Sequence, residues 1–192
     1  MTTETPIVLV VDHDRDRAQL YASYLDTECD VRVANDGPGA LDALDDDVDV
    51  LVLVRPGSGS GVDDVSTALG DRRSDVRVVL IRERDADLAA LTRAPDEVLS
   101  APVSAGTLRR TVSVLAAGRA YARGIGDLFS LARKRADVES DGTDDVRALD
   151  ARIDDLRAQL DRTLATLLDE GDFAAVYRAI DDDATDSDDG DV

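Results

Sequence analysis

Two carboxylates and an imidazole stand together near the N-terminus. Asp12, His13 and Asp14 directly follow the apolar run of residues 7–11. An open α/β sheet binds ligands at the carboxyl ends of its strands, and Mg²⁺ usually takes one or two protein carboxylates together with waters. Asp12 and Asp14 are therefore candidate ligands of a weak Mg²⁺ site. In the alternative that we favour, Asp12 or Asp14 caps the following helix and His13 is exposed.

The apolar run of residues 50–54 lacks the acidic residue that would complete such a site. It ends at Val54 and continues directly into Arg55-Pro56-Gly57. A valine supplies no nucleophile, no acid or base and no metal ligand, so the two carboxylates lack a third protein oxygen. The sequence therefore predicts no firm metal site, no cofactor and no enzymatic activity.

A glycine-rich segment, Gly57 to Gly61, follows this run. Backbone N–H groups before a helix can hold an anion, but the segment lacks the lysine and the spacing of a GxxxxGK[ST] loop. We interpret it as a flexible surface loop and keep a small-ligand or nucleotide-binding module as an alternative. The lone His13 and Cys29 belong to no catalytic motif.

Five short apolar runs are arranged to position these residues. They cover residues 7–11, 31–34, 50–54, 76–81 and 97–100. Amphipathic segments lie between them, around residues 18–25, 40–44, 62–69 and 86–91, and a fifth helix is expected after Ser104, a suitable N-cap. This alternation predicts an α/β, flavodoxin-like, doubly wound domain with a five-stranded parallel sheet over residues 1–117.

From Gly118 onward the pattern becomes helical. Glycines cost about 1 kcal/mol each within a helix relative to alanine, so we expect a kink or break near Gly124. Farther on, apolar residues repeat in alternating steps of three and four, as in a heptad seam: Val146, Leu149, Ile153, Leu156, Leu160, Thr163 and Leu167.

The partner of this seam is either the chain itself or a second copy. We favour antiparallel packing onto residues 121–138, because the seam spans only about three heptads. Residues 118–180 are thus expected to form a small all-helical domain, a helical hairpin or coiled-coil-like unit. Residues 181–192 are rich in aspartate without an apolar period and are expected to be a disordered acidic tail.

The chain has 42 Asp and Glu against 22 Lys and Arg, a formal net charge of -20, and Lys134 is its only lysine. Such self-repulsion is relieved in concentrated salt, where the Debye length falls to about 3 Å at 1 M. We therefore expect a halophilic cytoplasm. No apolar run reaches the roughly 20 residues that span a bilayer, so no membrane association is predicted.

Several of these segments carry a family resemblance. Residues 6–117 resemble a response-regulator receiver domain, through IVLVVD at 7–12, VRVANDG at 31–37, DVLVL at 49–53, PG at 56–57 and APV at 101–103. Residues 118–180 resemble the HalX domain that follows receivers in haloarchaea, through Tyr121, DLFSLARK at 127–134, the leucine-rich helix, and Asp172-Phe173.

The resemblance implies a fold whose usual function is phosphotransfer from a histidine kinase to an aspartate, with Mg²⁺, a hydroxyl residue and a lysine assisting. In this chain the acceptor position is Val54, and the second acidic position of the first strand is His13. The hydroxyl position is Arg82 and the lysine position is Ala101. The positions that match the family are Asp12, Asp14 and Pro102.

The resemblance thus implies a degenerate receiver, or pseudo-receiver. Because the machinery for phosphorylation is missing, we expect a phosphorylation-independent regulatory protein of the two-component type, acting in transcription through protein contacts. Arg82 is expected to point into the former pocket and to pair with Asp12 or Asp14. An unorthodox phosphoreceiver is a further alternative.

Two surfaces are candidates for interactions. Receivers commonly dimerise through a face that here includes Leu108, Val112 and Leu115, so a homodimer is expected there. A basic band could contact DNA phosphates, although the net charge makes direct DNA binding the less favoured alternative. Its members are Arg119, Arg123, Arg133, Lys134 and Arg135.

Overall fold

The computed structural model describes residues 5–55, 75–83, 94–138 and 143–169. The chain divides into two compact units, Met1–Ala116 and Ala117–Val192. Each unit has its own packing. None of the helices in the described ranges is long and apolar enough to cross a membrane.

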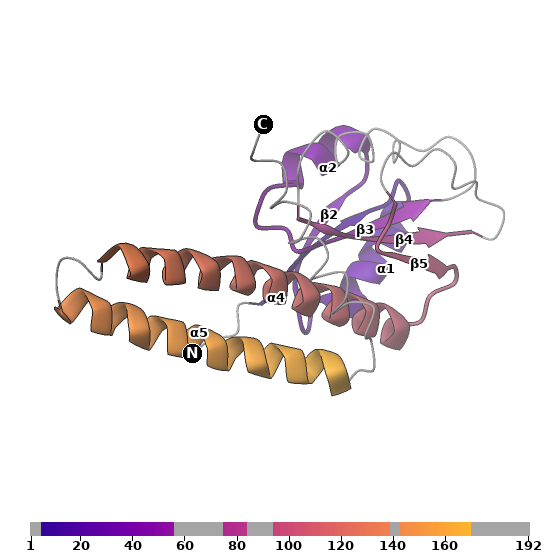
Figure 1. Cartoon of the computed structure of the whole chain (residues 1–192). Coiled ribbons are helices and arrows are strands. Elements are labelled where there is room, and N and C mark those ends of the chain that lie inside the picture. Colours follow the sequence, from indigo (N-terminus) through magenta and orange to yellow (C-terminus); the bar gives the residue numbers. More distant parts are fainter. Residues whose placement is uncertain (1–4, 56–74, 84–93, 139–142, 170–192) are drawn as a thin grey trace. The chain divides into compact units, whose positions relative to one another are not determined.

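The first unit contains one parallel sheet of five strands (Figure 1). The strands are β1 (Ile7–Val11), β2 (Asp30–Ala34), β3 (Val50–Arg55), β4 (Arg77–Arg82) and β5 (Glu97–Ser100). Their order across the sheet is β2-β1-β3-β4-β5, which is the flavodoxin-like order with its switch point between β1 and β3. The predicted fold class is confirmed.

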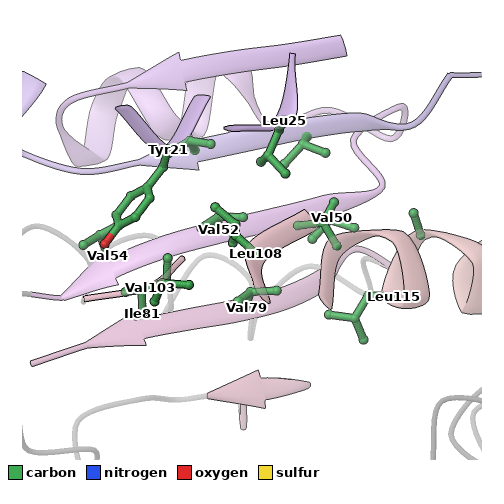
Figure 2. Packing of buried hydrophobic residues seen from close by; sticks show 14 residues of the cluster. Tyr21, Leu25, Val50, Val52, Val54, Val79, Ile81, Val103, Leu108 and Leu115 are labelled. Atoms are coloured by element: carbon green, nitrogen blue, oxygen red, sulfur yellow. The ribbon is translucent and has the colours of Figure 1, made fainter. Parts of the chain in front are cut away.

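The central strands β1, β3 and β4 are buried on both faces, which explains why they are nearly continuous apolar runs rather than alternating ones. The edge strands β2 and β5 are partly exposed. Within β1, Val8 and Val10 join one core cluster, whereas Leu9 and Val11 join the other. The first cluster also contains α1 and the start of α4, and Figure 2 shows its close packing around β3 and β4. The second contains residues of α2.

Side-chain caps fix where the helices begin. In α1 (Arg15–Leu25), Asp14 is the N-cap, and its carboxylate accepts from the N–H groups of Asp16 and Arg17 at 3.1 and 3.2 Å. In α2 (Gly37–Ala43), Asp36 accepts from Gly39 N–H at 2.7 Å. The predicted cap at Ser104 is confirmed, because its hydroxyl accepts from Thr107 N–H at 3.1 Å before α4 begins.

A buried ion pair joins β4 to the start of β5. Arg77 and Asp96 are each only 8% exposed, and Arg77 Nη1 lies 3.1 Å from Asp96 Oδ1. The other carboxylate oxygen of Asp96 accepts from Val78 N–H at 2.7 Å. A buried pair with these additional hydrogen bonds is costly to break, since either partner alone would leave an uncompensated charge.

The second unit is a helical hairpin. It consists of the later part of α4 (Ala105–Val138) and of α5 (Thr143–Asp169), which lie side by side in Figure 1. Gly124 lies opposite Leu160, and Arg135 forms an ion pair with Asp150. Because the partner number falls as the α4 number rises, the helices are antiparallel. The predicted packing of the heptad seam onto residues 121–138 is confirmed.

The seam residues of α5 are those that the heptad pattern selected. Ile153, Leu160 and Leu167, seven residues apart, are 6%, 7% and 0% exposed. The intervening positions Leu156 and Thr163 are partly buried. This regular spacing produces a single apolar stripe, as in a two-helix coiled coil.

The expected break near Gly124 is wrong, because α4 is one helix from Ala105 to Val138. A methyl group built on Gly124 would lie 2.7 Å from Leu160 Cδ2 and 3.9 Å from Leu156 Cδ1. The glycine therefore allows a close approach of two helices rather than a break in one.

Some expected elements lie outside the described residues. These are the helices around residues 62–69 and 86–91, the loop from Gly57 to Gly61, and the acidic tail from residue 181.

We predict that Gly124→Gln lowers the free energy of unfolding of the hairpin by about 1–3 kcal/mol, because the new side chain overpacks against Leu160. The matched control is Gly126→Gln, where a Cβ meets nothing within 4 Å. There the better helix propensity should stabilise by about 0.5–1 kcal/mol. Denaturant unfolding at high salt, followed by far-UV circular dichroism, measures both. Equal effects of the two substitutions would contradict the close approach at Gly124.

Candidate functional site

The sheet brings the predicted site residues to one edge. Asp12 directly follows β1, and the register pairs Val11 with Leu53, Val54 with Ile81, and Arg82 with Ser100. Parallel strands end at the same edge, so the ends of β1, β3, β4 and β5 surround one location.

Asp12 is held in this location by its own backbone. Its N–H donates to the carbonyl of Ala34 at 3.1 Å, and its carbonyl accepts from the Asn35 side-chain amide at 2.9 Å. Both contacts come from the end of β2. The Asp12 side chain is fully buried, so its carboxylate needs a compensating partner within the protein.

That partner is Arg17, which the sequence analysis did not identify. Arg17 Nε donates to Asp12 Oδ2 at 2.5 Å, and Arg17 Nη2 donates to Oδ1 at 2.9 Å. This is the two-pronged geometry in which guanidinium and carboxylate bind most strongly. Asp14 N–H adds a third donor, to Asp12 Oδ1 at 3.0 Å.

The electrostatics agree with this pairing. The hydrogen bond that Arg17 donates to Asp12 is the main influence that raises the pKa of Arg17 above its ordinary value, and burial opposes it. Arg17 Nη1 also lies 3.8 Å from Glu83 Oε1, just beyond the end of β4. Arg17, which is 27% exposed, therefore connects the carboxyl ends of β1 and β4.

The other two residues of the predicted triplet face solvent. Asp14 is exposed and caps α1. The hydrogen bonds that its carboxylate accepts from backbone N–H groups, chiefly that of Arg17, lower its pKa. His13 is 56% exposed, with Nδ1 at 3.4 Å from Asp12 Oδ1. Of our two interpretations, the capping one is confirmed for Asp14 and His13.

The carboxylates of this triplet already have donors within the protein. Both oxygens of Asp12 already accept from donors, and the carboxylate of Asp14 accepts from the first turn of α1. In the described ranges no three His, Cys, Asp or Glu side chains form a group that could hold a metal.

Val54 is part of the core. It is 3% exposed and belongs to the same cluster as Tyr21, Ile81 and Val103. Figure 2 shows the ring of Tyr21 reaching toward Val54, with Ile81 and Val103 close by. Burial is the largest influence on Tyr21 and raises its pKa. The position is thus filled by apolar packing.

Arg82 does not make the expected pair. Arg17, not Arg82, pairs with Asp12, and Asp14 caps α1, so that hypothesis is wrong. The Arg82 side chain is partly buried, and its Nε has no hydrogen-bond partner among the described residues. Its carbonyl accepts from Ala101 N–H at 2.8 Å. Arg17 is nearer in sequence to Asp12, and the cap at Asp14 turns it back toward that carboxylate.

The end of β5 is apolar as well. Ala101 packs against the first core cluster, and Pro102 follows it through a cis peptide bond. Pro102 itself is exposed. Neither residue supplies a charge to this edge of the sheet.

Comparison with known proteins identifies both parts of the chain. Residues 118–177 match the model of the HalX domain. A protein of Haloferax volcanii named “Putative transcriptional regulator” is 32% identical over 160 residues, which are 83% of this chain and 27% of that protein. This chain therefore spans well under two thirds of that relative.

Solved structures match the first part. NtrX from Brucella abortus, in complex with ATP, aligns with a TM-score of 0.54 and 23% identity over 64% of this chain and 29% of that one. A response-regulator receiver domain from Clostridium thermocellum aligns with a TM-score of 0.50 and 18% identity over 58% and 94%. The chain combines a receiver fold with a HalX domain. Both resemblances proposed from the sequence are confirmed.

The receiver fold does not present the expected dimer side chains. Leu108 and Val112 are fully buried and Leu115 is 5% exposed, and all three belong to the core beneath the sheet. Their assignment to an interaction surface was wrong. An apolar stripe at steps of three and four residues looks the same whether it faces the core or a partner.

The basic band has fewer available cationic side chains than the sequence suggested. Arg119 is 4% exposed, and Arg135 is paired with Asp150 of α5. The assignment of Arg119 to an exposed band was therefore wrong, whereas Arg135 is partly exposed and its charge is paired within the hairpin. Arg123, Arg133 and Lys134 remain exposed on the HalX domain.

One sequence signal could have revealed Arg17. It lies in the first turn of α1, where the helix dipole favours anions over cations. An arginine in this unfavourable place, five residues after a carboxylate at a strand end, indicates a specific partner nearby.

We predict that Val54→Asp destabilises the receiver fold by about 3–5 kcal/mol near neutral pH, because it buries a carboxylate without a cation. Burial would raise the pKa of the new carboxyl, so the stability deficit should grow as pH rises above about 4.

The matched control is Val54→Asn, because asparagine has nearly the same shape as aspartate and does not titrate. Unfolding of both variants is compared between about pH 4.5 and about pH 7, where a normal aspartate ionises fully. If the two variants have equal stability at both ends of this range, Val54 is not in a closed apolar environment.

Proposed function

We propose that this HalX protein is a phosphorylation-independent regulator of the response-regulator type, which acts in transcription through contacts with other proteins. The observation that carries this proposal is the burial of Val54, 3% exposed, at the position of the family's acceptor aspartate. Transfer to an aspartate requires a carboxylate nucleophile, and valine has none.

The regulatory role is supported by the receiver fold, the HalX match and the named function of the Haloferax volcanii relative. The relative also comes from a salt-loving archaeon, in line with the net charge of -20. We infer from these features that the protein is a regulator rather than an enzyme and that it works in the cytoplasm of a halophile.

Direct DNA binding is the second candidate. Its support is the exposed cationic group of Arg123, Arg133 and Lys134 on α4 of the HalX domain. Since Arg119 and Arg135 are withdrawn from that group, we favour protein partners. A ligand site at Gly57 to Gly61 and an unorthodox phosphoreceiver are the further alternatives.

We predict no mass gain when the protein is treated with acetyl phosphate and Mg²⁺ at native salt, because no carboxylate occupies the acceptor position. Intact-mass spectrometry measures this directly. A receiver domain that retains its acceptor aspartate is treated in parallel and must gain one phosphoryl group. The same gain in this protein, lost in Asp12→Asn, would contradict the proposal.

We further predict that tagged protein recovered from a halophilic host retains specific protein partners after nuclease treatment. The double variant Arg133→Gln, Lys134→Gln tests the alternative, and Arg152→Gln, Arg157→Gln on α5 removes the same charge as a control. DNA enriched at discrete loci and lost only in the first double variant would instead establish direct DNA binding.

A further inference from the structure

Asp12 is a fully buried carboxylate at the edge of the sheet where parallel strands end. A buried carboxylate persists in its charged form only with a cation and well-placed donors. A bound divalent ion and a protein cation are two ways to meet this requirement. The residues around Asp12 supply the second.

We propose that the guanidinium of Arg17 is the resident cation of this pocket and makes the receiver fold independent of divalent metal. This inference deepens the proposed function and rests on it. Arg17 contacts both carboxylate oxygens, at 2.5 and 2.9 Å, so it occupies the directions from which a metal would bind.

Three features suit Arg17 to this role. Its planar fork matches both oxygens of one carboxylate, which a single ammonium group does not do. It carries its charge at every physiological pH, and the bond to Asp12 raises its pKa further. It also approaches Glu83 to 3.8 Å, so one cation lies near carboxylates that follow two different strands.

The position of Arg17 is fixed by the chain itself. The Asp14 carboxylate accepts a hydrogen bond from the backbone N–H of Arg17, and the backbone N–H of Asp14 donates to the Asp12 carboxylate. The cap therefore links the start of α1 to the carboxylate that Arg17 binds. The resulting arrangement holds the end of β1 in one state without an external ligand.

The test compares thermal unfolding with MgCl₂ or MnCl₂ against KCl at equal ionic strength. The wild-type melting temperature should not depend on the divalent ion. Arg17→Met should lower that temperature by roughly 10 °C, since it leaves Asp12 uncompensated. Saturating Mn²⁺ should then restore part of the loss, and Asp12→Asn in the same background should abolish the restoration.

Two further variants keep the test decisive. Arg15→Met removes an exposed arginine of the same helix turn and should change neither the melting temperature nor the response to metal. Arg17→Lys keeps the charge and should fold without metal dependence even if Arg17→Met does not fold.

A saturable stabilisation of the wild-type protein by Mg²⁺ that is lost in Asp12→Asn would overturn this inference, because metal would then displace Arg17. Such a result would leave the proposed function intact as long as acetyl phosphate adds no mass. A gain of one phosphoryl group would instead contradict the proposed function, whatever the metal dependence.

Discussion

A carboxylate that is completely excluded from water sets the main constraint on the receiver fold. Asp12 is tied through its backbone to Ala34 and Asn35 at the end of β2, and through its side chain to Arg17 at the start of α1. The cost of burying the Asp12 charge is offset by the two hydrogen bonds that the Arg17 guanidinium donates to its carboxylate. The next strand end needs no such partner, because Val54 is packed among apolar side chains.

The same distinction between buried and exposed charge explains how so acidic a chain can remain folded in concentrated salt. Exposed charges are screened when the Debye length falls to about 3 Å, which relieves the repulsion of a net charge of -20. Buried pairs are screened much less. Asp12 with Arg17, and Arg77 with Asp96, therefore keep their attraction under conditions that weaken surface ion pairs.

Much of the fold could be predicted because an apolar pattern repeats along its central strands and along its last helix. The strands that are buried on both faces are unbroken apolar runs, and the seam from Val146 to Leu167 repeats through seven positions. Single residues were harder. A glycine such as Gly124 looks the same in the sequence whether it breaks a helix or allows a neighbouring helix to come close. Only the packed hairpin, in which Leu160 lies against Gly124, distinguishes the two roles.

The site shows the same limit. The absence of an acid at Val54 is visible in the sequence, because it depends on one position in one strand. That Arg17 rather than Arg82 is the partner of Asp12 could not be read from the sequence, because it depends on where α1 begins and how its first turn is oriented. Leu108, Val112 and Leu115 form a stripe that fits a core and a dimer equally well, and burial decides for the core.

The most direct test of the claim that the chain supplies its own cation is diffraction from crystals equilibrated with MnCl₂ at high KCl. Manganese is located by its anomalous scattering. We expect no manganese peak near Asp12 and both Arg17 nitrogens on its carboxylate. A manganese ion bonded to Asp12, with Arg17 turned away, would contradict the account.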